Sequence, residues 1–286
     1  MAVETTTFSN NSADTWFRDI MFDCVLCPRA CHVNRLAGQT GYCGQTAELM
    51  AARASLHYWE EPCISGTSGS GTVFFSGCNL RCVFCQNHNI ALGKAGRVIA
   101  PEHLAEIFLQ LQEQGANNIN LVTPTHFLPQ IVIALEQAKQ QGLHLPIVYN
   151  TGSYESPEAL RHLEGLVDIY LPDLKYFSPE LSTAYSHAPD YFETACAAIS
   201  EMYRQVGDSV IDEDTGLMQH GMIVRHLLLP GQTKDSKKIL RYLHETYGDH
   251  IYISIMNQYT PLPQVADIEV LNRTVCLLYT SDAADE

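Results

Sequence analysis

The chain has 286 residues, long enough for two average domains or one large α/β barrel. Apolar residues make up 46% and charged residues only 17%, a balance that excludes a disordered chain and favours a large buried core. No apolar stretch reaches the roughly 18 residues of a membrane span, and the N-terminus lacks the basic and apolar regions of a signal peptide. We therefore expect a soluble cytoplasmic protein without membrane contacts. The formal charge of -15 argues against binding to nucleic acid.

Short apolar strands alternate with amphipathic helices past about residue 70, which is typical of βαβ units. In chain order, the expected elements are strand 72–76, helix 101–115, strand 118–122, helix 131–142, strands 146–150 and 167–171, helix 195–206, strand 222–228, helix 239–248 and strand 251–256. Pro101 begins the first of these helices and Gly115 ends it. The pattern predicts a parallel sheet with a helix in most of its crossovers.

A parallel sheet with right-handed crossovers forms either an open doubly wound sheet or a barrel. No glycine-rich phosphate loop follows the first strand, so six βα units favour a partial (β/α)6 barrel of the TIM type. We expect this α/β barrel over residues 71–275, with its chemistry at the C-terminal ends of the strands. Residues 1–70 follow neither periodicity, and we expect them to form a small, separate Cys-rich module.

The last eleven residues, 276–286, resemble the translated read-through of a sequencing-library adaptor. We expect them to be foreign to the protein, so that the natural chain continues after Val275. The alternative is an ordinary frayed, polar C-terminus. The first interpretation predicts a further helix or strand after Tyr259 that helps to close the barrel.

Ten cysteines in a chain without an export signal favour metal or catalytic roles over disulfides. Three of them, Cys78, Cys82 and Cys85, form a C-x3-C-x2-C run directly after the first expected strand. Structural zinc sites and most iron-sulfur clusters take four protein ligands, so three thiolates leave one metal position open for another ligand. The alternative is a zinc knuckle that a distant residue such as His88 completes.

This run, with the aromatic Phe84 just before its last cysteine, resembles the signature of radical S-adenosylmethionine (SAM) enzymes. Within that superfamily, residues 24–256 are similar to the group of the pyruvate formate-lyase activating enzyme. Further matching phrases are 57–62, 84–87, 123–126, 149–151, 173–175 and 225–227. The resemblance implies that Cys78, Cys82 and Cys85 hold a [4Fe-4S] cluster, which binds SAM and cleaves it reductively to a 5'-deoxyadenosyl radical for hydrogen abstraction. It also implies a flavodoxin- or ferredoxin-type electron donor and, as in glycyl-radical activation, a protein or peptide substrate.

Other positions of the resemblance point to contacts with SAM. Phe84 is expected beside the cofactor. The activating enzymes carry a Gly-Gly-Glu segment after the second strand, and this chain has Thr123 and Thr125 there instead. We expect these two hydroxyls to bind the methionine part of SAM, and Asn150 to bind its ribose or carboxylate. For Thr125, a helix N-cap is the structural alternative.

Three charged residues at later strand ends complete the expected SAM site. Asp173 and Lys175 match an Asp-x-Lys segment of the activating enzymes and are expected to contact SAM or the substrate backbone. Arg225 is expected to pair with a carboxylate through two hydrogen bonds. The structural alternatives are an ion pair at the barrel end for Asp173 and Lys175, and a buried strut for Arg225. His126 and His226 are expected to be hydrogen-bonded core histidines.

A second cysteine set comprises Cys24, Cys27 and Cys31 in a C-x2-C-x3-C run, followed by Cys43. Four thiolates within twenty residues predict a second metal site, either tetrahedral zinc or an auxiliary iron-sulfur cluster. The spacing does not decide between the two metals. Cys63 is either a spare ligand or a packed thiol.

The function that we expect is therefore that of a radical SAM oxidoreductase acting on a protein or peptide. Two alternatives remain open at this stage. In the first, both cysteine sets are structural and the protein is a non-catalytic iron-sulfur or zinc protein for electron transfer or binding. In the second, the radical chemistry is retained but acts on a small molecule or on RNA, the latter disfavoured by the acidic charge.

Overall fold

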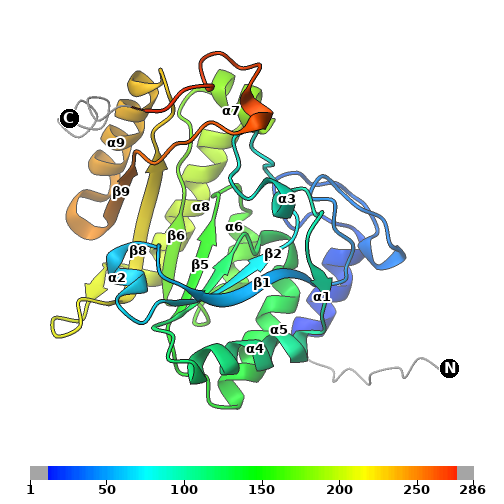
Figure 1. The fold of residues 1–286 in the computed structure, drawn as a ribbon. Helices are drawn as coiled ribbons and strands as arrows, with labels where there is room; N and C mark the ends of the chain where they lie inside the picture. The colour runs from blue at the N-terminus through cyan, green and yellow to red at the C-terminus, as the bar shows by residue number, and fades with distance from the viewer. Residues whose placement is uncertain (1–11, 276–286) are drawn as a thin grey trace.

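The computed structural model describes residues 12–275 (Figure 1). The tail 276–286 and any element that follows it lie outside these residues. Within them, none of the helices combines the length and the apolar character needed to cross a membrane.

Six parallel strands form the centre of the fold and follow one another in chain order (Figure 1). They are β2 (Ser70–Phe75), β4 (Ile119–Val122), β5 (Ile147–Thr151), β6 (Ile169–Pro172), β8 (Met218–Leu227) and β9 (Tyr252–Met256). Each strand pairs in parallel with the next one of this series. No pairing between β2 and β9 is found in the described part of the chain, so the sheet is a partial (β/α)6 barrel, as the sequence predicted.

Four long helices lie between successive strands and cover the outer face of the sheet. They are α4 (Pro101–Glu113), α5 (Leu128–Gln140), α8 (Tyr191–Val206) and α9 (Thr233–Tyr247). Pro101 stands in the first turn of α4, where its missing N–H costs no helical hydrogen bond. The spacing of Leu104, Phe108 and Leu111 puts three apolar side chains on one face of α4, and all three are buried. Four short helices occupy the loops: α2 (Pro62–Ser65), α3 (His88–Ala91), α6 (Pro157–Leu160) and α7 (Pro179–Ser186).

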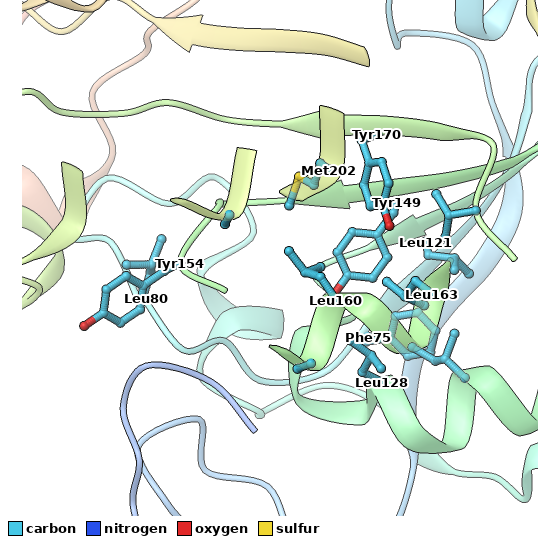
Figure 2. Packing of buried hydrophobic residues seen from close by; sticks show 14 of the residues in the cluster. Phe75, Leu80, Leu121, Leu128, Tyr149, Tyr154, Leu160, Leu163, Tyr170 and Met202 are labelled. Atoms are coloured by element: carbon cyan, nitrogen blue, oxygen red, sulfur yellow. The ribbon is translucent and has the colours of Figure 1, made fainter. Parts of the chain in front are cut away.

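The main hydrophobic core lies between the strands and the helices (Figure 2). Successive side chains of a strand point to opposite faces, so alternate residues such as Leu121, Tyr149 and Tyr170 enter this core. The rings of Tyr149 and Tyr170, on neighbouring strands, meet edge to face with their centroids 5.8 Å apart. The residues between them point into the barrel instead, where Val148 packs with Ile64 of α2 in a separate apolar cluster.

The N-terminal segment is joined to the barrel more closely than its sequence indicated. It contains α1 (Ser12–Phe22), a 3-10 turn (Arg35–Ala37) and β1 (Met50–His57), and β1 pairs antiparallel with β2. A two-residue strand, β3 (Arg97–Val98), covers the outer edge of β1. We expected no strand at 50–57, because this stretch has few β-branched residues and no regular alternation. A domain boundary near residue 70 stays a prediction.

The end of the described chain returns toward the loops at the C-terminal ends of the strands (Figure 1). After β9 it contains one short 3-10 turn (Pro263–Val265). Val265 and Leu271 are buried in the main core, and the Tyr259 hydroxyl donates to the carbonyl of Leu271 at 2.7 Å. Gln264 donates to the carbonyl of Cys85 at 3.3 Å, so this segment touches the first cysteine run.

Candidate functional site

The loop after β2 carries Cys78, Cys82 and Cys85 at the C-terminal end of that strand. Gly77 starts this loop with a φ of +89°, and a Cβ atom at this position would lie 2.8 Å from the carbonyl oxygen of Cys43. Only glycine tolerates both conditions. The loop then turns back on itself, because the N–H of Cys85 donates to the carbonyl of Cys82 at 3.1 Å.

The three thiols are buried beside one another. Ser186 donates its hydroxyl to Cys82 Sγ at 3.0 Å, and the N–H of Leu80 donates to Cys78 Sγ at 3.4 Å. Burial, followed by the nearby thiols, raises the pKa of Cys85 to about 12 and also raises the pKa of Cys78. Ionised thiols here therefore require a compensating positive charge, which a bound metal centre supplies.

The structure does not distinguish between kinds of metal centre at these thiols. Within residues 12–275, no three His, Cys, Asp or Glu side chains are placed to hold one metal ion. The zinc knuckle with His88 and the iron-sulfur cluster therefore both stay predictions from the sequence at this point.

Polar side chains from three neighbouring strands meet at the same end of the barrel, with Arg225 of β8 at their centre. Arg225 donates from Nε to Asp173 Oδ1 at 2.8 Å, from Nη1 to Glu60 Oε2 at 3.0 Å and from Nη2 to Asn150 Oδ1 at 2.6 Å. Lys175 Nζ donates to the other carboxylate oxygen of Asp173 at 2.5 Å. The structure thus joins the four predicted residues in one network. It also adds Glu60, to which we had assigned no role.

Lys175 links this network to the cysteine loop. Burial opposes the charge of its ammonium group, but Asp173 and then Cys82 outweigh burial and raise the pKa of Lys175. Burial likewise opposes the charge of Asp173, but Arg225 and Lys175 prevail and lower its pKa. At Glu60 burial prevails over Arg225 and raises the pKa. The ammonium group of Lys175 therefore interacts with the thiol of Cys82 on one side and with the carboxylate of Asp173, which Arg225 also contacts, on the other.

Thr123 and Thr125 occupy different surroundings. Thr125 is 2% exposed and donates its hydroxyl to Glu155 Oε1 at 2.6 Å, and the hydroxyl of Thr151 donates to the same oxygen. Thr125 makes no N-cap hydrogen bond. Burial raises the pKa of Glu155, a residue that our sequence reasoning missed, to about 7. Thr123 is partly exposed after β4, with a φ of +57°, and its N–H donates to the carbonyl of Asn150. SAM contacts of both threonines stay predictions, and the Thr125 hydroxyl already has a partner.

Phe84 lies in an aromatic cluster. Its ring meets those of Tyr176, Tyr185 and Tyr259 edge to face, with centroids 6.2 to 6.4 Å apart. These contacts give Phe84 a packing role in the core, where it is 8% exposed. A contact with SAM stays a prediction.

The two core histidines are hydrogen-bonded, as expected, but to different extents. His226 uses both nitrogens, to the carbonyl of Leu174 at 2.7 Å and to the hydroxyl of Ser236 at 2.9 Å. His126 donates from Nε2 to the carbonyl of Ser76, and its Nδ1 has no partner within the described part of the molecule. Burial lowers the pKa of His226 to about 4 and that of His126 to about 3, so both are neutral at physiological pH.

Asn120 is a second residue that sequence reasoning missed. Its neighbours Ile119 and Leu121 point to the helices, so Asn120 points into the barrel, where it is paired in register with Val148. Neither atom of its buried side-chain amide has a hydrogen-bond partner among the described residues. Such a group in a barrel interior needs a polar partner, either water or a ligand. A lone polar residue in the apolar strand was the available signal.

Residues 72–243 match the sequence pattern of the Radical SAM superfamily. The match covers more than half of the chain and includes the cysteine loop together with Asn150, Asp173, Lys175 and Arg225. The chain belongs to the radical SAM superfamily. Membership implies an enzyme that uses a [4Fe-4S] cluster and SAM and that needs a reductant. The three thiols and the adjoining charged network fit these two groups.

Two individual relatives share less than 30% of their aligned residues with this chain. An uncharacterized protein of Methanocaldococcus jannaschii is 27% identical over 266 residues, which are 90% of this chain and 71% of that protein. The pyruvate formate-lyase-activating enzyme of Clostridium pasteurianum is 29% identical over 121 residues, which are 40% of this chain and 48% of that enzyme.

Two solved structures are similar at low sequence identity. Methylornithine synthase (PylB) has a TM-score of 0.46 at 15% identity, over 72% of this chain and 58% of that one. Native anSMEcpe with bound AdoMet has a TM-score of 0.45 at 14% identity, over 65% of this chain and 50% of that one. This chain therefore spans about half of the length of anSMEcpe and of the activating enzyme.

The second cysteine set lies outside the matched radical SAM region. Cys24, Cys27, Cys31 and Cys43 line one common cavity, and all four are free thiols. Burial raises the pKa of Cys27 to about 12, and it also raises the pKa of Cys43. The structure therefore brings the four predicted ligands together. Cys63 instead packs against the apolar cluster inside the barrel.

Proposed function

We propose that this radical SAM protein cleaves SAM reductively at Cys78, Cys82 and Cys85 and takes a hydrogen atom from a protein or peptide substrate. When bound, the cluster and SAM supply the electron and the 5'-deoxyadenosyl radical for that abstraction. The observation that carries the proposal is the position of Lys175, whose ammonium group interacts both with Asp173 and with the cluster thiols.

In this proposal each polar residue of the network has a separate task. Lys175 offsets the negative charge of the thiolates. Asn150 and Asp173 bind polar groups of SAM, because both stand at strand ends next to the cysteine loop. Arg225 is a positioning residue: it holds the side chains of Asn150 and Asp173 in place and is itself anchored by Glu60.

Two observations favour a protein or peptide as the substrate. The Clostridium pasteurianum relative is an activating enzyme for pyruvate formate-lyase, which favours a protein substrate. Inside the barrel, the amide of Asn120 offers a donor and an acceptor that no other described side chain uses. A main-chain peptide group, which carries one acceptor and one donor, fits such an amide.

We also propose that the cavity lined by Cys24, Cys27, Cys31 and Cys43 is a second metal site. Four thiols that line one cavity are a typical ligand set for zinc or iron-sulfur centres. The reductant is proposed to be a flavodoxin- or ferredoxin-type protein, because the reaction needs a low-potential one-electron donor.

The test is anaerobic reconstitution with iron and sulfide, followed by dithionite and SAM, with detection of 5'-deoxyadenosine. The wild-type chain is expected to form this product, and Cys82→Ala is expected to form none. Cys63→Ala is the matched control, since Cys63 lies in neither cysteine set.

The outcome that contradicts the proposal is equally defined. A wild-type chain that holds a confirmed four-iron cluster and forms no 5'-deoxyadenosine would exclude reductive SAM cleavage. For the substrate, a peptide deuterated at its glycine should transfer deuterium to 5'-deoxyadenosine. Deuterium transfer from a labelled small molecule alone would contradict the protein substrate.

A further inference from the structure

Two buried side-chain hydroxyls lie beside one thiol of the first cysteine set, which comprises Cys78, Cys82 and Cys85. Ser186 donates its hydroxyl to Cys82 Sγ at 3.0 Å, and the hydroxyl of Tyr176 lies 2.7 Å from Ser186 Oγ. Ser186 and Tyr176 are 0% exposed, and Cys82 is 8% exposed. Water has little access to these groups, so the protein itself supplies the hydrogen bond to this sulfur.

The direction of both hydrogen bonds follows once Cys82 binds a metal. A ligating cysteine is a thiolate, which has no proton and can only accept. Ser186 has a single hydroxyl proton, so donation to Cys82 Sγ leaves none for Tyr176. The Tyr176 hydroxyl must then donate to Ser186 Oγ. The two hydroxyls form a chain that ends on the sulfur, and each hydrogen bond of such a chain strengthens the next.

The main chain fixes Ser186 in this position. Ser186 is the last residue of α7, where the carbonyl groups lack helical donors. Arg29 donates to the carbonyl of Ser186 at 3.0 Å. The N–H of Val83, inside the cysteine loop, donates to the carbonyl of Tyr185 at 2.9 Å. The end of α7 is therefore joined to the loop that carries Cys82.

Aromatic packing fixes the position of Tyr176. Its ring contacts those of Phe84, Tyr185 and Tyr191, with centroids 5.3 to 6.4 Å apart. Tyr176 also follows Lys175 directly in the chain, and the Lys175 ammonium group interacts with the same thiol, that of Cys82. The loop after β6 therefore brings both a cation and a hydroxyl chain to one sulfur.

We propose that the hydroxyl chain of Tyr176 and Ser186 raises the reduction potential of the [4Fe-4S] cluster held by the first cysteine set. Reduction adds negative charge to the cluster and its thiolates, and a hydrogen bond strengthens as its acceptor becomes more negative. Ser186 therefore stabilises the reduced state more than the oxidised state. In this reduction the electron donor loses one electron and the cluster gains it, while both hydroxyl protons stay on their oxygens. The inference rests on the proposed function, since it needs the cluster at Cys82.

The test is a redox titration of the anaerobically reconstituted chain without SAM, followed by electron paramagnetic resonance (EPR). The signal of the first set is the one that is absent from Cys82→Ala with Cys85→Ala. Ser186→Ala removes the donor to the sulfur and is expected to make the midpoint potential of that signal more negative. We expect a shift of about 59 mV, which is a tenfold change in the equilibrium constant for one electron.

Ser182→Ala is the matched control, and its midpoint potential should equal that of wild type. Ser182 lies in the same helix, is 1% exposed, and donates its hydroxyl to the carbonyl of Pro179 instead of a thiol. Tyr176→Phe is a second variant, which keeps the donor to Cys82 but removes the hydroxyl behind it. A smaller shift in the same direction is expected for Tyr176→Phe.

An unchanged or more positive midpoint potential in Ser186→Ala would overturn the inference, and so would an equal shift in Ser182→Ala. If Ser186→Ala binds no cluster, an unchanged potential in Tyr176→Phe overturns it in the same way. The titration involves no SAM cleavage. A wild-type chain whose cluster is reduced but forms no 5'-deoxyadenosine therefore contradicts the proposed function alone, and the effect of Ser186 on the potential is still decided.

Discussion

Cys78, Cys82 and Cys85 follow a buried parallel strand, whereas Cys24, Cys27, Cys31 and Cys43 lie in a segment with little regular structure. The charges around the two sets differ as well. Beside the first set, Arg225 and Lys175 are paired with Asp173 and Glu60. Beside the second, Arg35 is buried without an acid.

This difference indicates how each set is stabilised. The first set follows a strand of the barrel, beside a network in which each cation already has a carboxylate partner before any cofactor binds. In our proposal the thiols of the second set ionise on a metal and supply the negative charge that Arg35 lacks, so the folding of this segment is expected to be coupled to metal binding. The comparison is therefore tested by substitutions whose effect on stability is measured in both the metal-free and the metal-loaded chain.

The largest effect is expected for Arg225→Met. It leaves Asp173 and Glu60 as buried carboxylates without their main partner, which lowers the free energy of unfolding by about 3 to 5 kcal/mol. Because the network is complete without metal, the loss should be the same in the metal-free and the loaded chain. Denaturant unfolding under anaerobic conditions measures both. Arg225→Lys is the control, and it should recover only part of the loss, since an ammonium group cannot reproduce the three-way fork.

The second effect is a pH dependence of the free energy of unfolding, which arises at the buried His226 of β8. Burial lowers the pKa of His226 from 6.5 to about 4, so the folded state binds fewer protons than the unfolded state between these values. The stability that neutral His226 contributes is complete above pH 6.5 and is lost as the pH falls through 4. It amounts to about 3 kcal/mol.

The measurement is the free energy of unfolding of the metal-free chain between pH 4 and 7. His226→Gln has no titrating group, so its stability should fall less steeply than that of wild type as the pH decreases. The exposed His103→Gln is the control and should follow wild type. Parallel curves for His226→Gln and wild type would show that His226 does not cause the loss of stability at low pH.

The third effect distinguishes the second cysteine set from the first. Arg35→Met removes a cation from the four-cysteine cavity, together with its hydrogen bonds, and should lower the stability of the metal-loaded chain by about 2 kcal/mol. In the metal-free chain the loss should be smaller, because the cation there lacks an opposite charge. Unfolding curves of both forms give the two values. Equal losses, as expected for Arg225→Met, would remove the distinction between the sites.

The smallest effect is expected at Phe84. Phe84→Leu keeps an apolar side chain but loses the edge-to-face contacts with Tyr176, Tyr185 and Tyr259, which should cost about 1 kcal/mol. If Phe84 only packs, the KM for SAM stays at the wild-type value. A raised KM for SAM would instead support the contact between Phe84 and SAM that the sequence motif predicted.

Much of the barrel and part of its site could be predicted from the sequence. The six parallel strands have apolar cores and turn signals, and they were placed within a few residues of their observed bounds. Asn150 was predicted because it follows a strand, and Asp173 and Lys175 because they match an Asp-x-Lys segment of the activating enzymes. The structure joins all three in the network around Arg225, and their contacts with SAM stay predictions. The four N-terminal cysteines were grouped by spacing, and the structure places them around one cavity.

Other features depend on contacts between residues distant in the chain. Glu60 reaches Arg225 across 165 positions and follows β1, a strand without the usual β-pattern, so sequence gave no indication of its partner. Glu155 follows β5 in a polar loop and is buried in contact with Thr125 and Thr151, whose hydroxyls donate to it. Spacing also cannot choose between zinc and iron, since both accept four thiolates.

The central claim is that only the first cysteine set cleaves SAM. It is tested most directly by the yield of 5'-deoxyadenosine from two reconstituted variants, with dithionite as the electron donor. Cys27→Ala with Cys31→Ala retains the first set and should form the product. Cys82→Ala with Cys85→Ala retains the second set and should form none, even when the metal proposed for that set is bound. Product from the second variant, or none from the first with its four-iron cluster confirmed, would contradict the account.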